Sequence, residues 1–159
     1  MNSTDPFTLT IELIARAIHA EYLVLVSGDP GKGPSAVPWE ELPEEFREAN
    51  RDQARAIVEK LRVLGLGIAP GVSGTVSGMI AFSDEQMDRL ARMEHLRWMA
   101  EKERNGWVHG SVRDNNTKIH PDLVPWEELD EQAKEKDRNA VGVIPKILKA
   151  AGYVIQPLN

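Results

Sequence analysis

Apolar residues recur at helical spacing in the first half of the chain and predict two helices there. The first is predicted over residues 7–26, because Asp5 suits the position before a helix and Pro6 suits its first turn. The second begins at Pro43 and ends near Gly65, since glycine readily adopts the left-handed conformation that closes a helix. A short extended segment is expected to follow it.

The second half repeats this pattern of apolar and polar positions. Ser83 opens a capping box, S-x-x-Q, and predicts a third helix that stops at Gly106. A fourth helix is expected from its N-cap, Asp130, to Gly152, with a kink or break near Pro145, because proline cannot donate the helical hydrogen bond. The four helices predict a mainly α fold with long ordered loops and little strand.

The six residues VPWEEL occur twice, at 37–42 and at 124–129, which is an offset of 87. Residues 14–22 also align with residues 90–98, at an offset of 76, so the second half has a longer loop by 11 residues. A short linear motif used twice would not extend the match so far beyond the hexamer. The repeat therefore favours an internal duplication of a helix pair.

Duplication of a helix pair implies two pseudo-symmetric halves. We expect a degenerate first half at 1–70, a linker at 71–82 and a second half at 83–159, packed together as one compact domain. A helix pair this short buries its apolar stripes poorly alone, whereas two pairs can share a core. The interface between such halves is a common place for a ligand cleft.

Composition narrows the class of protein. The chain has 159 residues, a net charge of −6 and no cysteine. The net charge argues against nucleic acid as a partner, and no apolar run approaches the ~18 residues of a membrane span. The N-terminal residues lack the pattern of a secretion signal. We expect a cytoplasmic protein with no membrane partner, and a homo-oligomer is compatible with this composition.

The third predicted helix carries an unusual face. On a helical wheel His95, Trp98 and Lys102 fall on one arc with apolar residues. His19 and Tyr22 occupy the matching positions of the first half. Two interpretations are open: the aromatic residues are core anchors beside satisfied histidines, or they form the two plates of a base-stacking sandwich.

The loop over residues 106–121 contains Trp107, Arg113, Asp114, Lys118 and His120. Arginine, lysine and histidine that converge from one loop can bind a phosphate or carboxylate. In the alternative interpretation, the arginine pairs with a carboxylate and the tryptophan anchors the loop to the core. Long ordered loops in compact domains are more often functional, so we favour a ligand role.

The sequence offers no pattern typical of a catalytic or metal site. His109 and His120 lack the spacing of metal ligands on one helix face, and no serine has the context of a nucleophile elbow. The glutamates of the hexamers are explained by the starts of helices, where they complement the helix dipole. We therefore expect no enzymatic activity, no catalytic residue, no cofactor and no metal.

The run E-H-x-x-W-x-x-x-K-x-x-x-G-W-x-x-G-x-x-R-D, followed by K-x-H-P-x-L-V-P, resembles the ryanodine receptor (RyR) repeat domain. Its fixed positions are Glu94, His95, Trp98, Lys102, Gly106, Trp107, Gly110, Arg113, Asp114, Lys118, His120, Pro121, Leu123, Val124 and Pro125. The strong resemblance covers residues 83–157. The first half resembles a degenerate copy, which has Tyr22 where the family has Trp and lacks the G-W and R-D elements.

The resemblance implies a mainly helical tandem that can bind an adenine nucleotide between the aromatic residues of its two H-x-x-W elements. Carried over, Tyr22 and Trp98 are the stacking pair, and Lys102, Arg113 and Lys118 are phosphate contacts. Free-standing prokaryotic and phage-encoded relatives are thought to take part in nucleotide-signal and conflict systems.

We therefore expect a non-enzymatic module that binds a small anionic ligand, such as an adenine nucleotide or a cyclic nucleotide, between the two halves. The predicted ligand-binding residues are Tyr22, Trp98, His19, His95, Lys102, Trp107, Arg113, Asp114, Lys118 and His120. The alternative is a protein-interaction or assembly module in which exposed Trp39 and Trp126 dock on a partner. A nucleotide hydrolase is a weaker third hypothesis, because no acid–base pair supports it.

Overall fold

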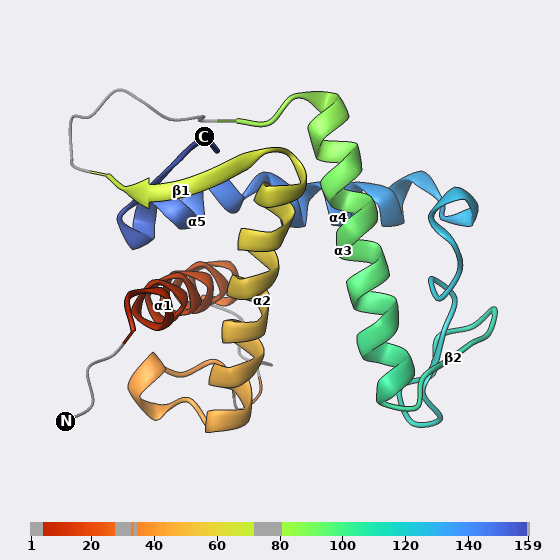
Figure 1. The fold of residues 1–159 in the computed structure, drawn as a ribbon. Helices are drawn as coiled ribbons and strands as arrows, with labels where there is room; N and C mark the ends of the chain where they lie inside the picture. The colour runs from red at the N-terminus through yellow and green to blue at the C-terminus, as the bar shows by residue number, and fades with distance from the viewer. Residues whose placement is uncertain (1–4, 28–32, 34, 72–80, 159) are drawn as a thin grey trace. The chain divides into compact units, whose positions relative to one another are not determined.

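Helices dominate the computed structural model, which describes residues 5–27, 33, 35–71 and 81–158 (Figure 1). The α-helices are α1 (Pro6–Val26), α2 (Glu44–Val63), α3 (Asp84–Arg104), α4 (Glu131–Gly142) and α5 (Ile144–Ala151). The strands are β1 (Leu66–Pro70), β2 (Val108–His109), β3 (Ile119–His120) and β4 (Tyr153–Pro157), and single 3-10 turns are η1 (Trp39–Glu41) and η2 (Trp126–Glu128). The prediction of a mainly α fold with little strand is confirmed.

The described residues divide into two compact units. The first unit contains the described residues up to 71 together with 144–158, and the second contains 81–143. The C-terminal helix α5 and strand β4 therefore belong with the first half of the chain. The predicted second half, 83–159, differs from the second unit because its residues from 144 onward belong to the first unit. The packing of both halves into one compact domain stays a prediction. Most of the predicted linker, 72–80, lies outside the described residues.

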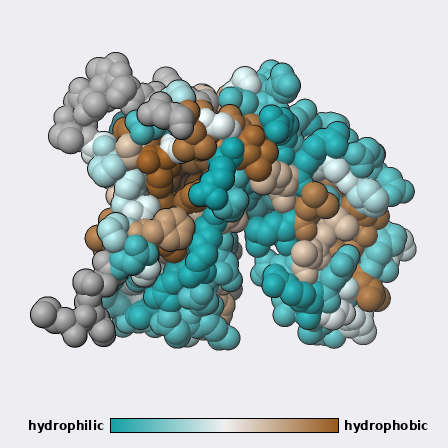
Figure 2. Space-filling view, viewed as in Figure 1, coloured by the Kyte–Doolittle hydropathy of each residue, from teal (hydrophilic) through white to brown (hydrophobic). Residues whose placement is uncertain are grey.

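The first unit is built around α1, which packs against α2 and α5. Strands β1 and β4 pair in antiparallel register, with Ile68 opposite Ile155. The core is apolar and includes Ile14, Leu61 and Leu148, whose side chains are fully buried. Burial of this kind supplies most of the stabilisation of a helical unit. In Figure 2 most of the visible surface is hydrophilic, whereas apolar residues gather where β1 and α5 lie in Figure 1.

The second unit consists of α3 packed against α4, with the long loop and its two short strands beside them. Strands β2 and β3 pair in parallel over two residues each. The buried apolar residues include Leu90 and Ala91 of α3, Leu129 after η2, and Val141 of α4. This unit contains most of the residues that the sequence singled out for ligand binding.

The predicted ends of the helices are confirmed. Gly65, Gly106 and Gly152 have positive φ angles of 75°, 87° and 92°, which non-glycine residues adopt only at a cost. Ser83 forms both hydrogen bonds of the capping box. The Asp130 carboxylate accepts a hydrogen bond from the backbone of α4 at 2.8 Å. Local sequence signals thus set these boundaries.

The predicted break near Pro145 is also confirmed. Helix α4 ends at Gly142, and α5 begins two residues later with Pro145 in its first turn. A proline is tolerated there because the first N–H groups of a helix have no partner within the helix. The break separates the two units along the chain.

The tryptophans of the two hexamers are buried and have matching surroundings. Trp39 is 7% exposed and Trp126 is 8% exposed. Six cations lie 5.5–5.9 Å from the two ring centroids, with Arg16, Arg47 and Arg51 over Trp39, and Arg92, Lys134 and Arg138 over Trp126. The prediction that these two side chains dock on a partner through exposed faces is wrong, because the rings are packed inside their own units.

The ion pairs beside the two tryptophans match as well. Arg51 binds the carboxylates of Glu12, Glu44 and Glu48, and Arg138 binds those of Asp88, Glu131 and Glu135. Each residue of the second set lies 76 or 87 positions after its counterpart, the two offsets of the sequence repeat. The hexamer therefore has the same structural role in both units: it seats a tryptophan under a cluster of paired cations.

Candidate functional site

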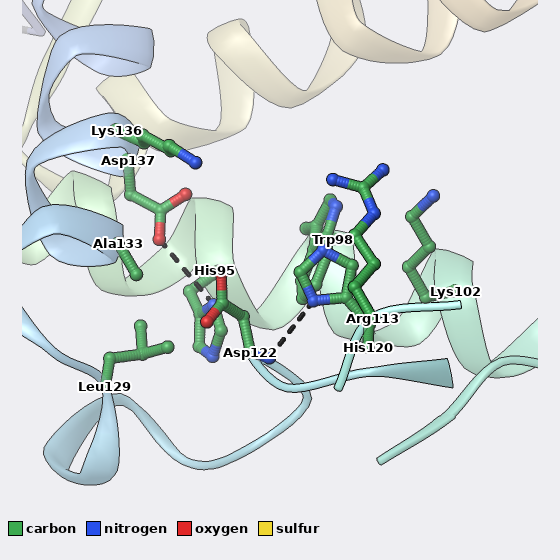
Figure 3. Close-up of a pocket in the computed structure, with 10 residues that line it drawn as sticks. All are labelled: His95, Trp98, Lys102, Arg113, His120, Asp122, Leu129, Ala133, Lys136 and Asp137. Carbon is green, nitrogen blue, oxygen red and sulfur yellow. Dashed lines mark hydrogen bonds and ion pairs between the residues drawn. The ribbon is translucent and has the colours of Figure 1, made fainter. Parts of the chain in front are cut away.

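The second unit contains a pocket of about 260 Å³ (Figure 3). It is lined by His95, Trp98, Lys102, Arg113, His120, Asp122, Leu129, Ala133, Lys136 and Asp137. Helix α3 forms one wall, the long loop supplies Arg113, His120 and Asp122, and α4 supplies the wall with Lys136 and Asp137. All ten residues belong to one unit, so the pocket does not depend on the position of the other.

Helix α3 places three functional side chains on one face. His95, Trp98 and Lys102 are spaced by three and four residues, and this spacing aligns side chains along a helix. His95 is buried, whereas Trp98 and Lys102 are partly exposed toward the pocket. Leu96, on the other side of the helix, is 66% exposed. The face predicted from the wheel is therefore the face that lines the pocket.

His95 ties α3 to the second hexamer. Its Nε2 donates a hydrogen bond to the backbone carbonyl of Val124 at 2.7 Å. The Nδ1 atom on the other side of the ring lies 3.6 Å from Oδ2 of Asp137. The ring also stacks on Trp98, with centroids 5.8 Å apart and planes at 22°. His95 is thus a satisfied core histidine that also forms part of the pocket wall.

Asp137 is the most perturbed acid of the pocket. Burial raises its pKa to about 6 from an ordinary value of 3.8, and the charges of Glu94 and Asp122 raise it further. His95 and Arg97 oppose this shift. The position was not predicted as a site residue. The sequence feature that could have indicated Asp137 is its alignment with Asn50 in the first half. This alignment places a carboxyl group where the other copy has an amide.

His120 packs against both tryptophans of this region. Its ring meets Trp98 edge to face at 4.9 Å and lies 6.2 Å from Trp107. Its Nδ1 accepts a hydrogen bond from the backbone N–H of Asp122 at 3.1 Å. Burial lowers the pKa of His120, and the charges of Arg113 and Lys102 act in the same direction. His120 is therefore a neutral imidazole near pH 7, with its proton on Nε2.

Lys102 and Arg113 are the cations at the end of the pocket beside Trp98 (Figure 3). The Lys102 Nζ lies 4.5 Å from the ring centroid of Trp107, a cation–π distance. The Arg113 Nε donates a hydrogen bond to the amide oxygen of Asn115 at 3.0 Å. This side chain is exposed, and its remaining N–H groups can donate to an oxyanion.

Two predicted ligand contacts have structural roles in the loop. Lys118 has a φ of 58°, and its Nζ donates to the carbonyl of Asn105 at the end of α3, at 2.7 Å. Asp114 accepts hydrogen bonds from the backbone of Asn116 and Thr117, and these bonds lower its pKa. Neither residue is among the ten that line the pocket, and a ligand contact by either stays a prediction.

Tyr22 and His19 lie in the first unit. Their rings are 5.9 Å apart with planes at 29°, close to the geometry of the His95–Trp98 pair. The Tyr22 hydroxyl shares a hydrogen bond with the hydroxyl of Ser35 at 3.0 Å. A sandwich between Tyr22 and Trp98 would join the two units and stays a prediction.

Comparison with known protein families agrees with this architecture. Residues 80–157 match the model of the RyR domain. This segment belongs to the RyR domain family. The RyR domain therefore includes the whole pocket of the second unit and continues into α5 and β4, which pack in the first unit.

The structure of the RyR domain adds five pocket residues that sequence reasoning missed. These are Asp122, Leu129, Ala133, Lys136 and Asp137. Four of them lie within or next to α4, which contacts α3 only in the folded unit. Within the described residues, no three acidic or histidine side chains meet as metal ligands would, and no helix has the length and apolar character of a membrane span.

Proposed function

We propose that the RyR domain of this protein binds a nucleotide or nucleotide-derived signal in the pocket of its second unit. The observation that carries this proposal is the position of Trp98, a partly exposed indole in a cavity lined by Lys102, Arg113 and Lys136. An aromatic face binds a base by stacking, and a lysine–arginine pair binds a phosphate. Together they match the two chemically distinct ends of a nucleotide.

The size and charge of the pocket favour a small ligand. Its volume of about 260 Å³ is near the lower end of small-molecule sites, which span ~300–1,000 Å³. The carboxyl groups of Asp122 and Asp137 can accept hydrogen bonds from amino groups of a base. Adenine nucleotides and cyclic nucleotides combine such amino groups with a phosphate, so they are the preferred ligand class.

We also infer that the two helix pairs are copies of one RyR-like repeat. The matching hydrogen bonds of His19 and His95 and the matching cation clusters support this inference. In the proposed tandem, Tyr22 contributes the second stacking plate for a ligand held by Trp98. The protein would then act without catalysis in the cytoplasm, as a sensor or a sequestering protein in a bacterial or phage signalling system.

The proposal is tested by calorimetry and thermal shift with AMP, ATP, cyclic AMP and a cyclic dinucleotide. We expect at least one of them to bind and to raise the melting temperature, and Trp98→Ala to weaken binding about 5- to 150-fold, since base stacking contributes ~1–3 kcal/mol. Leu96→Ala, on the opposite face of α3, is the matched control. Binding by Trp98→Ala at wild-type affinity, or no binding by the wild type, would refute the proposal.

Tyr22→Ala separates the two forms of the proposal. If the ligand lies between both aromatic residues, this variant weakens binding about as much as Trp98→Ala does. If the pocket of the second unit is sufficient, the affinity stays at the wild-type value. Substitution of Tyr22 leaves the ten lining residues of the pocket unchanged.

A protein-interaction module is the second candidate function. Val108 and Val112, in the loop of the second unit, are 57% and 75% exposed, and exposed apolar residues are common at docking surfaces. This candidate predicts no thermal shift with any nucleotide. It also predicts that the wild-type chain captures a partner protein, that Val112→Asp loses this capture, and that Trp98→Ala retains it.

A further inference from the structure

One side of the pocket carries a contact that requires a proton. The Nε2 of His95 donates to the carbonyl of Val124, and a carbonyl oxygen can only accept. The proton of a neutral His95 is therefore fixed on Nε2, and Nδ1 presents a lone pair. That lone pair faces Oδ2 of Asp137 at 3.6 Å. Two acceptors face each other there unless one of them is protonated.

The pair has two ways to hold that proton. Either His95 is an imidazolium next to an Asp137 carboxylate, or a neutral imidazole faces a protonated Asp137. In both forms the pair has no net charge. Loss of the proton leaves a carboxylate opposite a lone pair and makes the pocket wall more negative by one charge. The raised pKa of Asp137, about 6, shows that its environment favours the protonated form.

The two arginines nearest to the pair in the sequence, Arg97 and Arg138, are bonded to other carboxylates and do not take the place of the proton between His95 and Asp137. Glu94 and Arg97 face Asp137 from α3, and Asp122 faces it from the loop. Arg97 is already bonded to Glu94 and Glu101. On α4 itself, Lys136 lines the same pocket and the guanidinium of Arg138 is bonded to Asp88. Leu129 and Ala133 supply apolar surface on this side.

The first unit shows the same histidine without this pair. His19 donates to the carbonyl of Val37 at 2.6 Å, as His95 does to Val124. The residue aligned with Asp137 is Asn50, which carries an amide in place of a carboxyl group. An amide can donate to an imidazole nitrogen at any pH. The proton requirement is therefore specific to the unit that contains the pocket.

We propose that the His95–Asp137 pair holds one exchangeable proton and couples anion binding in the pocket to pH. This proposal rests on the proposed function for its ligand. An anion at Lys102 and Arg113 favours the uncharged pair over the negative one, because both share the pocket. The affinity for an anion is therefore highest at acidic pH and falls as the pair loses its proton. At pH values just above this transition, binding takes up a proton from the solvent, because the bound anion raises the pH at which the pair loses its proton.

The test uses cyclic AMP, because its phosphodiester does not titrate near neutral pH, unlike a phosphomonoester with a second pKa of ~6. Calorimetry from pH 5 to pH 8 should show an affinity loss of roughly tenfold for the wild type, the effect of one charge at close range. Titrations in buffers of different ionisation enthalpy should show proton uptake on binding. Asp137→Asn, which copies Asn50, should bind with no such pH dependence and no proton uptake.

Asp122→Asn is the matched control, since it removes one carboxylate from the same pocket without touching His95. We expect it to raise the affinity for cyclic AMP and to keep the pH dependence, with the transition at a lower pH because the charge of Asp122 no longer raises the pKa of Asp137. A pH dependence that persists in Asp137→Asn overturns the proposal. A wild-type affinity that is constant from pH 5 to pH 8 overturns it as well.

A measurement on the free protein separates this proposal from the proposed function. The side-chain carboxyl carbon of Asp137 can be followed by NMR as the pH changes, with the His95 ring nitrogens observed in parallel. We expect a shared transition well above the ordinary range of aspartate. If Asp137 titrates as an ordinary aspartate while His95 stays neutral, the shared proton is refuted. If no nucleotide binds but the shared transition is found, the shared proton is established, and the proposed function fails together with its coupling to pH.

Discussion

His95 and Val124 are joined by a hydrogen bond of 2.7 Å from the imidazole Nε2 to the backbone carbonyl. The same bond joins His19 to Val37 at 2.6 Å. Each valine is the first residue of a VPWEEL hexamer. The histidine of each H-x-x-aromatic element therefore fixes the loop that leads to the buried tryptophan, while the aromatic residue three positions later remains partly exposed.

The role of these two hydrogen bonds in holding the loops can be tested by removing the histidine that donates each one. We expect His19→Ala and His95→Ala each to lower the free energy of unfolding by about 1–3 kcal/mol, because each removes a buried side chain and leaves a part-buried carbonyl without its partner. Urea denaturation measures the change. His109→Ala is the control, since His109 is exposed and surface substitutions change stability by about 0.5 kcal/mol or less. Equal effects of all three substitutions would contradict the anchoring role.

Truncation of the hexamer tryptophans should be more damaging. Trp39→Ala and Trp126→Ala each remove a buried indole and leave three cations without their aromatic partner. We expect a loss of about 3–5 kcal/mol in the free energy of unfolding for each variant. Thermal and urea denaturation check this value, with the partly exposed Trp107→Ala as the comparison. A loss below about 1 kcal/mol for either variant would contradict the burial of these two rings.

The stability of the protein should depend on the protonation of Asp137. Its pKa in the folded state, about 6, lies above the ordinary value of 3.8, so the folded chain holds a proton that the unfolded chain has lost. The contribution of this carboxyl group to the free energy of unfolding therefore falls as the pH rises from about 4 to about 6, relative to a side chain that does not titrate. At about 1.4 kcal/mol per pKa unit, this contribution is at most roughly 3 kcal/mol.

Asp137→Asn isolates that contribution. Urea denaturation of the wild type and the variant at pH 4 and pH 7 should show the variant gaining stability relative to the wild type at the higher pH. Asp122→Asn, measured in parallel, is expected to produce a smaller change, because it removes only one of the causes that raise the pKa of Asp137. A stability difference between Asp137→Asn and the wild type that is independent of pH would show that this carboxyl group does not titrate in that range.

Arg113 and Lys118 should separate ligand binding from loop stability. Arg113 lines the pocket, whereas the side chain of Lys118 bonds the end of α3. We expect Arg113→Ala to weaken cyclic AMP binding about tenfold or more, the effect of a lost charged hydrogen bond, with little change in melting temperature. We expect Lys118→Ala to lower the melting temperature and to weaken binding less than Arg113→Ala does, because Lys118 is not among the residues that line the pocket. Calorimetry and thermal denaturation of both variants distinguish these outcomes.

Local signals in the sequence determined the helices and their ends. The capping box at Ser83, the N-cap at Asp130 and the left-handed glycines act through contacts within one turn of a helix, so the order of residues is sufficient to predict them. The repeat also placed His19 beside Tyr22 and His95 beside Trp98, because residues three apart meet on a helix. Arg113 and Lys102 were predicted from residue type and the family resemblance.

Tertiary structure decided which of these residues share a pocket. Asp137 lies 42 positions after His95, and the two meet only because α4 packs against α3. The same packing adds Lys136 to the pocket. The side chain of Lys118, by contrast, donates a hydrogen bond to the carbonyl of Asn105 at the end of α3. Periodicity specifies which face of a helix is apolar, but it does not specify the partner of that face. The sequence therefore determined the helices and the two histidine–aromatic pairs on α1 and α3. The packing of α3 on α4 decided which charged groups line the pocket and placed Asp137 beside His95.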